Sequence, residues 1–172
     1  YNSLAAFALA HEYILDVNII KNAIEKYHGV GRRFEYLGKY NGAYIYDDYA
    51  HHPSEIKTTL ESVKSVKHKS SWAVFQSHTY SRTKEHLDAF ADVLANFDHV
   101  IIAKIYPARE INTFNISEEM LVDKIKDKNP NVIYIDDFDK IVEFLKENVK
   151  EEDLVITIGA GPINYVSKKL VD

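Results

Sequence analysis

The sequence contains no cysteine among its 172 residues. Disulfide bonds and catalysis by a thiolate are therefore excluded, and we expect a cytoplasmic protein. No apolar run approaches the roughly 18 residues that a membrane-spanning helix needs. The net charge is -5 and no long run has a single sign, so the chain lacks the basic face that favours binding to nucleic acid or to an anionic membrane.

Several familiar binding motifs are also missing. No GxxxxGK[ST] loop is present, so the chain alone has no recognisable cradle for a triphosphate. The glycines of Gly159–Gly161 do not belong to a complete GxGxxG motif, because position 164 is asparagine. No HxH or HExxH pattern occurs, and His51 and His52 would need further ligands to hold a metal ion, so we expect no metal site.

We do not expect the first segment to be a signal peptide, because it has no basic start and carries His11, Glu12 and Asp16. It also lacks an initiator Met, and we expect the chain to be part of a longer protein. Apolar residues at helical spacing predict helices over 1–28, with a break near residues 16–18. The glycines of "HGVGRRFE" predict a linker after them. We therefore divide the chain into residues 1–30 and 31–172.

From residue 34 onward, strand-like and helix-like stretches alternate. Asn41-Gly42 suits the positive φ angles of a tight hairpin turn. The later strands are apolar without clean alternation, which is typical of strands covered on both faces. We predict a Rossmann-like α/β fold with a mostly parallel sheet, an antiparallel N-terminal hairpin and helices on both faces. The expected strands are 34–40, 43–49, 71–76, 99–106, 131–136 and 153–161. One helix is expected to start at Pro53, and the others are expected over 82–97, 117–128, 137–149 and 162–170. Ser117 and Asp137 are the expected N-caps of two of these helices.

Polar and aromatic residues gather where the expected strands end. Parallel strands bring their carboxyl ends to one edge of the sheet, and ligands bind in the crevice there. The sequence therefore predicts a binding cleft at this edge. Its candidate residues are Asp47, Asp48, Tyr49, His51 and His52 after the second strand, His78, Tyr80 and Arg82 after the third, Arg109 and Glu110 after the fourth, and Gly159 and Gly161 after the last.

Each of these features also has a structural explanation. Asp47 and Asp48 could end a strand and cap a helix, and the two histidines could be turn residues on the surface. Arg32-Arg33 could be a solvated pair. Arg82 begins the predicted helix, where a cation opposes the helix dipole, which suggests that it faces an anion.

Four stretches together resemble the carboxyl-terminal part of a Mur ligase: "GVGRRFE", "YDDYAHHPSEI", "VFQSHTYSRT" and "IYPARE". The second stretch is the most specific, and the order and spacing of the other three support it. The resemblance covers the whole chain. It implies that residues 1–30 are the last helices of a central ATP-binding domain and that residues 31–172 are the Rossmann-like third domain.

Members of this family join a carboxylate to an amine at the expense of ATP, through an acyl phosphate. The "SEI" after the histidines is most similar to the members that add L-alanine to UDP-N-acetylmuramate for peptidoglycan synthesis. The resemblance implies that ATP and Mg²⁺ are held mainly by upstream domains and that this domain closes over the nucleotide with the amino acid. The 172 residues alone should then be inactive. The implied site residues are Arg33 and Asp48 for ATP, His51 and Arg82 for catalysis, and Tyr49, His51, His78, Arg82 and Arg109 for the substrate.

The match is not complete. Ser77 and Thr79 stand where many relatives have a proline and an arginine, so one candidate anion ligand is missing. Arg82, Lys104 or Arg109 could supply the charge instead. The histidine that accepts a proton from the incoming ammonium group is left open among His51, His52 and His78. Two other functions also stay open: a sister ligase that attaches a whole peptide, and a non-catalytic Rossmann-like module that binds a nucleotide or a protein.

Overall fold

The computed structural model describes residues 2–13, 15–27 and 29–172, so residues 1, 14 and 28 of the predicted helical segment lie outside the described part. The chain divides into two compact units, Tyr1–Gly31 and Arg32–Asp172. The first unit consists of α1 (Asn2–Glu12) and α2 (Val17–Glu25). Asp16 caps α2 and accepts a hydrogen bond from the backbone N–H of Asn18 at 2.8 Å, which accounts for the predicted break. None of the described helices is long and apolar enough to cross a bilayer.

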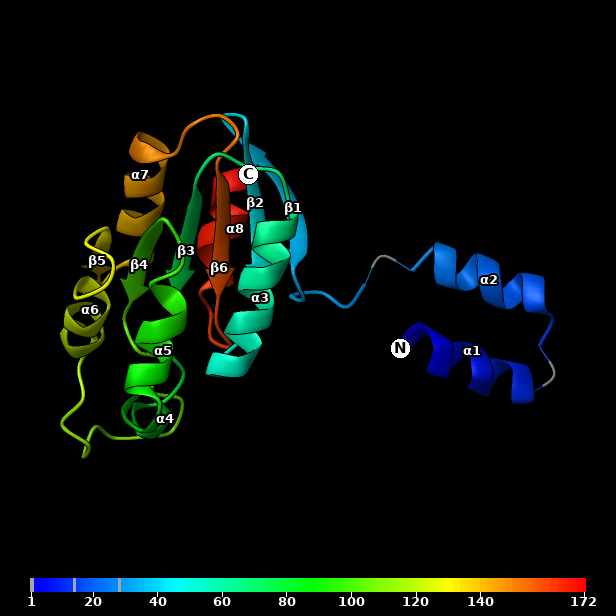
Figure 1. Cartoon of the computed structure of the whole chain (residues 1–172), viewed down its shortest axis with the longest axis horizontal. Coiled ribbons are helices and arrows are strands. Elements are labelled where there is room, and N and C mark those ends of the chain that lie inside the picture. The colour runs from blue at the N-terminus through cyan, green and yellow to red at the C-terminus, as the bar shows by residue number, and fades with distance from the viewer. Residues whose placement is uncertain (1, 14, 28) are drawn as a thin grey trace. The chain divides into compact units, whose positions relative to one another are not determined.

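The second unit is built around a six-stranded sheet with the strand order β1-β2-β6-β3-β4-β5 (Figure 1). β1 and β2 are antiparallel, and all other neighbours are parallel. This arrangement confirms the predicted α/β class and the antiparallel N-terminal hairpin. The strands are β1 (Glu35–Tyr40), β2 (Ala43–Asp48), β3 (Ser71–Phe75), β4 (His99–Ala103), β5 (Val132–Ile135) and β6 (Leu154–Ile158).

The hairpin forms where the sequence predicts it. Asn41 and Gly42 both have positive φ angles, of 46° and 82°, and they join Tyr40 to its partner Ala43. This is the backbone that an Asn-Gly turn favours, because asparagine tolerates the left-handed region and glycine enters it freely.

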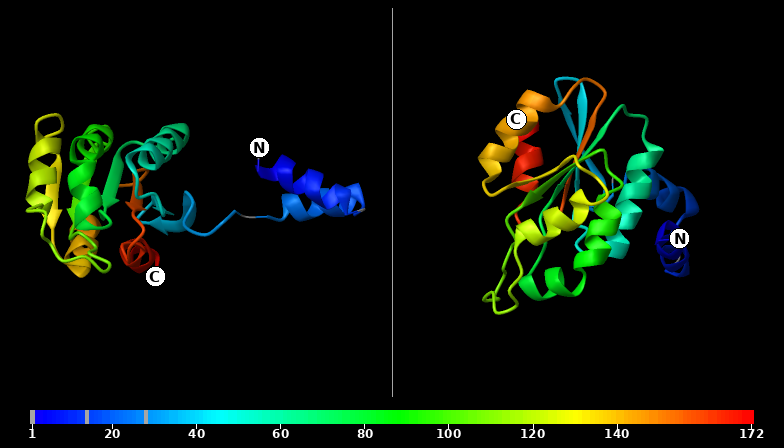
Figure 2. Two further views of the ribbon diagram at one scale, coloured as in Figure 1. Left: turned by 90° about the horizontal axis from the view of Figure 1, so that it is seen from below. Right: turned by 60° about the vertical axis from the view of Figure 1, so that its left-hand side comes forward.

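Helices cover both faces of the sheet, as the views in Figure 2 show. One apolar cluster lies between the sheet and α3, α5 and α6, and a second lies between the sheet and α7 and α8. Burial on both faces explains why β3 and β6 are buried along their whole length and are mostly apolar, without clean alternation. The helices are α3 (Pro53–Ser65), α4 (Tyr80–Glu85), α5 (Leu87–Leu94), α6 (Glu118–Lys126), α7 (Phe138–Asn148) and α8 (Asn164–Val171).

Three sequence-based expectations need correction. The helix predicted over 82–97 is two helices, α4 and α5, because the chain leaves helical geometry at His86 (φ -113°, ψ 19°). The strand predicted over 99–106 ends at Ala103, and Tyr106 forms only an isolated bridge with His78. Ser117 occupies the N-cap position of α6 but its side chain makes no capping hydrogen bond, whereas Asp137 caps α7 as predicted.

Candidate functional site

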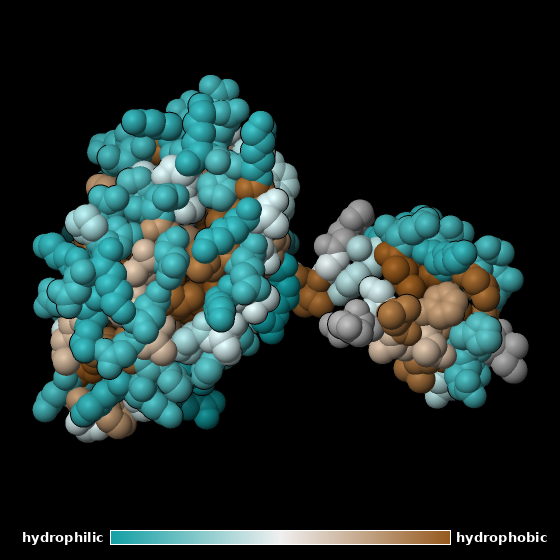
Figure 3. Space-filling model, viewed as in Figure 1, coloured by the Kyte–Doolittle hydropathy of each residue, from teal (hydrophilic) through white to brown (hydrophobic). Residues whose placement is uncertain are grey.

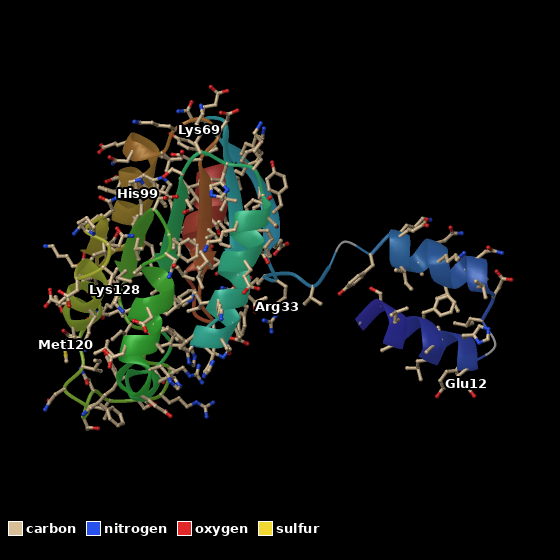
Figure 4. All side chains as sticks on the ribbon, in the orientation of Figure 1. Glu12, Arg33, Lys69, His99, Met120 and Lys128 are labelled. Carbon is tan, nitrogen blue, oxygen red and sulfur yellow. The ribbon has the colours of Figure 1, made fainter. Side chains whose placement is uncertain are left out.

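The carboxyl ends of β2, β6, β3 and β4 lie along one edge of the sheet, the lower end of the strands in Figure 1. Arg33 lies toward this edge in Figure 4, while Lys69 and His99 lie toward the opposite end of the strands. We call the carboxyl edge the rim; it comprises residues 32–34, 47–55, 76–82, 104–110 and 159–161.

The corner after β2, which is rich in titratable side chains, caps helix α3. His52 is the N-cap of α3, and its Nδ1 accepts a hydrogen bond from the backbone N–H of Ser54 at 3.3 Å. Glu55 completes a capping box, because its carboxylate accepts the backbone N–H groups of His51 (3.0 Å) and His52 (3.2 Å). Pro53 is at the first helical position, which costs no hydrogen bond. His52 is thus structural, and the aspartates end the strand without capping the helix.

Asp48 is buried and held by three donors. Its Oδ1 accepts from the backbone N–H of Ala50 at 2.9 Å, and its Oδ2 accepts from the backbone N–H of Phe34 at 3.2 Å and from the Thr59 hydroxyl at 3.1 Å. Burial raises the pKa of Asp48, although these hydrogen bonds and the charge of Arg33 oppose the rise. A carboxylate offers about four acceptor positions, so roughly one is left for a ligand.

A cavity of about 300 Å³ opens beside Asp48 and is lined also by Arg33 and Glu55. Arg33 has a half-exposed side chain, 4.0 Å from Glu55. Burial raises the pKa of Glu55. The hydrogen bonds from the backbone N–H groups of His51 and His52 and the charges of His51 and Arg33 outweigh this effect, so the pKa of Glu55 lies below its usual value. The two residues predicted to contact ATP therefore line one cavity. An acceptor and a mobile cation on its walls fit the hydroxyl and phosphate groups of a nucleotide.

Arg32 is a part of this rim that sequence reasoning treated as a surface residue. Its Nε donates to Asp47 Oδ2 at 2.8 Å, and its Nη2 donates to the carbonyl oxygen of Gly159 at 2.6 Å. Its guanidinium also lies over the Tyr49 ring, 4.9 Å from the centroid. Asp47 is buried, and its second oxygen accepts from the Thr157 hydroxyl at 2.6 Å. Arg32 thus joins the ends of β2 and β6.

The ring of His51 is oriented by its Nδ1 atom. This nitrogen lies 3.0 Å from the carbonyl oxygen of Tyr49 and 3.4 Å from Glu55 Oε2. Both partners only accept hydrogen bonds, so Nδ1 carries a hydrogen and Nε2 is the atom that can accept a proton. The Tyr49 ring packs edge-on against His51 at 5.5 Å, and the His78 ring lies 6.1 Å from it.

His78 and Arg82 each place a buried polar atom without a hydrogen-bond partner in the described chain on the same segment of the rim, residues 76–82. His78 Nδ1 and Arg82 Nη1 are buried and have no hydrogen-bond partner among the described residues. Burial, the charge of Arg82 and the charge of His51 lower the pKa of His78, whereas Glu110 opposes this change. The His78 ring is therefore neutral near neutral pH. Arg82 Nη1 can still donate a hydrogen bond to a ligand. Such a donor is suited to a carboxylate or a phosphate.

The remaining predicted residues have different positions. Arg109 is exposed, and its side chain makes no hydrogen bond or ion pair within the described part of the chain. Thr79 is the N-cap of α4 with a φ of 67°. Glu110 binds the start of α4, a role that the local sequence pattern did not indicate. No group of three potential metal ligands occurs in residues 2–13, 15–27 and 29–172.

Comparisons with known proteins agree with the family resemblance found in the sequence. Residues 32–161 match the family described as "Mur ligase, glutamate ligase domain". Two curated relatives called UDP-N-acetylmuramate--L-alanine ligase are 48% identical over the whole chain (Caldanaerobacter subterraneus subsp. tengcongensis) and 46% identical over 99% of it (Lachnospira eligens). The chain spans 37% of the length of each of these relatives.

Solved structures agree as well. UDP-N-acetylmuramate-alanine ligase MurC from Thermotoga maritima superposes with a TM-score of 0.79 at 26% identity, over 99% of this chain and 36% of that one. A murein peptide ligase from Psychrobacter arcticus has a TM-score of 0.66 at 24% identity, over 98% of this chain and 35% of that one, which supports the fold alone.

Proposed function

Because the chain belongs to the Mur ligase family, we propose that it is the carboxyl-terminal domain of a cytoplasmic ATP-dependent ligase that adds L-alanine to UDP-N-acetylmuramate. The observation that carries the proposal is the composition of the rim. A cavity with Asp48 and Arg33 lies on the same edge as Arg82, whose Nη1 has no hydrogen-bond partner in the described part of the chain. The names of the relatives supply the substrates, and the rim supplies groups of suitable chemistry.

In this proposal the two parts of the rim have separate tasks. ATP supplies the phosphoryl group that activates the muramate carboxylate, with Mg²⁺ held mainly by upstream domains. Asp48 accepts a ribose hydroxyl with its remaining acceptor position, and Arg33 approaches the phosphates because its exposed side chain is free to move. Holding both substrates in place is itself a large part of catalysis in such reactions.

The amino acid occupies the other part of the rim. Arg82 Nη1 donates to the carboxylate of L-alanine, with Tyr49 and Arg109 at the edges of the site. His51 Nε2 accepts the proton that the ammonium group must lose before it attacks, since Nδ1 of the same ring already carries a hydrogen. His78 stays neutral beside Arg82 and avoids a second positive charge there.

We further propose that residues 1–30 belong to the central ATP-binding domain of the longer protein. Apolar side chains are exposed on this helical unit, and Figure 3 shows them gathered over it. A cavity of about 450 Å³ on the unit is lined mostly by apolar residues. Apolar patches of this kind are usually covered in the native protein, and upstream helices of the same chain would cover them. The exposed residues include Leu4, Leu9, Tyr13, Leu15, Ile19 and Tyr27.

A domain exchange tests the proposed function. The 172 residues replace the matching part of the Caldanaerobacter relative, and the unmodified relative is the control. We expect the chimera to form ADP and UDP-N-acetylmuramoyl-L-alanine, detected by mass spectrometry, and the 172 residues alone to form neither. A folded chimera without product, beside an active control, would refute the proposal.

The same assay separates the alternative ligase. A sister enzyme of this fold would use a tripeptide in place of L-alanine. Preference of the chimera for the tripeptide would establish it. ATP binding by the chimera without either product would instead favour the non-catalytic module.

A further inference from the structure

Arg82 lies on a helix that is too short to hold itself in place. α4 has six residues, Tyr80–Glu85, and isolated helices of this length are not stable in water. The N-cap of the helix, Thr79, is a non-glycine residue with a positive φ of 67°, so the backbone there is strained. The Thr79 hydroxyl lies at a long 3.4 Å from the backbone N–H of Arg82. Something other than local sequence must therefore fix the start of α4.

Glu110 provides this support from a segment 29 residues away. Its Oε2 accepts the backbone N–H of Ser81 at 2.9 Å, and its Oε1 accepts the Ser81 hydroxyl at 2.5 Å. The hydroxyl and the N–H of Ser81 lower the pKa of Glu110, so the carboxylate is ionised over the physiological range. A bidentate, charge-assisted contact fixes both position and orientation.

We propose that Glu110 is a positioning residue for Arg82. It holds Ser81, the neighbour of Arg82, and thereby fixes the first turn of α4 so that Arg82 Nη1 faces the place of the substrate carboxylate. The inference deepens the proposed function, because the role of Arg82 toward L-alanine rests on it. The link between Glu110 and Arg82 itself depends only on the contacts through Ser81.

The geometry also explains why a charged residue is suited to this task. The first N–H groups of a helix lack partners within the helix, and a carboxylate there satisfies them. Glu110 lies at the end of a turn, in which its backbone N–H donates a hydrogen bond to the carbonyl oxygen of Pro107 at 2.9 Å. The Lys84 ammonium donates to the carbonyl oxygen of Phe114 at 2.9 Å, a second link between α4 and the same loop. The loop is therefore joined to α4 at two places, Ser81 and Lys84.

The first test uses the 172-residue chain and does not depend on ligase activity. NMR relaxation of the Arg82 Nε–Hε group measures how firmly the side chain is held. We expect Glu110→Ala to increase its mobility and Glu110→Gln to increase it less, because one acceptor oxygen remains. Glu119→Gln is the control, an exposed glutamate on α6. Unchanged mobility of Arg82 in Glu110→Ala would overturn the inference.

The second test measures steady-state kinetics in the active chimera. Glu110→Ala removes the charge-assisted contact with Ser81. This substitution should raise the KM for L-alanine by about tenfold and leave the KM for ATP nearly unchanged. General damage to the fold would not separate the two constants in this way. Ser81→Ala should have a smaller effect, and Glu110→Ala with Ser81→Ala should equal Glu110→Ala alone.

Equal changes in both KM values, or no change in the KM for L-alanine, would overturn the positioning role. A chimera that does not use L-alanine at all would instead refute the proposed function, and the NMR measurement would still decide whether Glu110 holds Arg82.

Discussion

Arg32 and Arg33 are adjacent at the start of the second unit, but we expect them to contribute very differently to its stability. Arg32 lies between Asp47 and the Gly159 carbonyl, and its side chain is 23% exposed, while that of Asp47 is 2% exposed. Arg33 is 54% exposed and lies 4.0 Å from Glu55. Arg32→Ala should therefore leave a buried carboxylate without its cation, whereas Arg33→Ala should remove only a surface contact.

The expected magnitudes follow from burial. Removing one partner of a buried ion pair typically costs about 3–5 kcal/mol. Asp47 keeps the Thr157 hydroxyl and Arg32 is partly exposed, so we expect the lower end, about 3 kcal/mol. Exposed pairs contribute about 0–1 kcal/mol, and Arg33→Ala should cost no more than about 0.5 kcal/mol. Arg32→Lys should lie between them, because lysine cannot reproduce the fork that bonds two acceptors.

The assay is urea unfolding followed by tryptophan fluorescence. Trp72 is the only tryptophan and is 7% exposed in β3, so its signal reports the second unit alone. With a slope of about 2 kcal/mol per molar urea, the midpoint of Arg32→Ala should fall by about 1.5 M, and that of Arg33→Ala by less than about 0.3 M. A difference between the two variants below about 1 kcal/mol would show that the Arg32 network contributes little and would refute this reasoning.

Three further predictions concern the rim. His52→Ala should lower the free energy of unfolding by about 1 kcal/mol through loss of the α3 cap, and His52→Asn should restore most of it; equal losses in the urea midpoint would contradict this. Burial and the charge of Arg82 hold the pKa of His78 in the folded chain below its usual 6.5. As the pH falls, His78 therefore becomes protonated in the unfolded chain before it does so in the folded chain. The free energy of unfolding should thus be greatest above pH 6.5 and fall below it, and His78→Gln should reduce that fall in urea titrations between about pH 5 and pH 8. In the active chimera, Asp48→Ala or Arg82→Ala should slow product formation by roughly a hundredfold with circular dichroism unchanged; wild-type rates would remove both residues from the site.

The fold could be predicted because its determinants are local. The alternation of apolar strands and amphipathic helices, together with the Asn41-Gly42 turn, indicates a parallel sheet with an antiparallel hairpin. The rim followed from topology, since parallel strands end at one edge. The break at His86 was missed because the apolar spacing of 87–97 continues the helical period of the preceding turn. Nothing local shows that Glu110 fixes the start of α4.

The different roles of Arg32 and Arg33 could not be predicted for a related reason. Arg32 and Phe34 both have positive φ angles, of 59° and 46°, so their side chains do not follow the alternation of a strand. The partner of Arg32 at Gly159 is 127 residues away in sequence. The sequence around an arginine pair that follows a glycine therefore indicates a solvated surface pair. The contact of Arg32 with Gly159 arises only because the sheet brings β6 beside β2.

The position of β6 also determines how the rim is divided. β6 is the last strand in the sequence, yet it lies between β2 and β3. The part of the rim with Asp48 is thus separated from the part with Arg82 by the turn that follows β6. Gly159 in this turn has a φ of 152°, and a Cβ there would lie 2.7 Å from the backbone oxygen of Gln76. Glycine is required at this residue because a Cβ would overlap that backbone oxygen, so the turn that separates the two parts of the rim carries no side chain at Gly159.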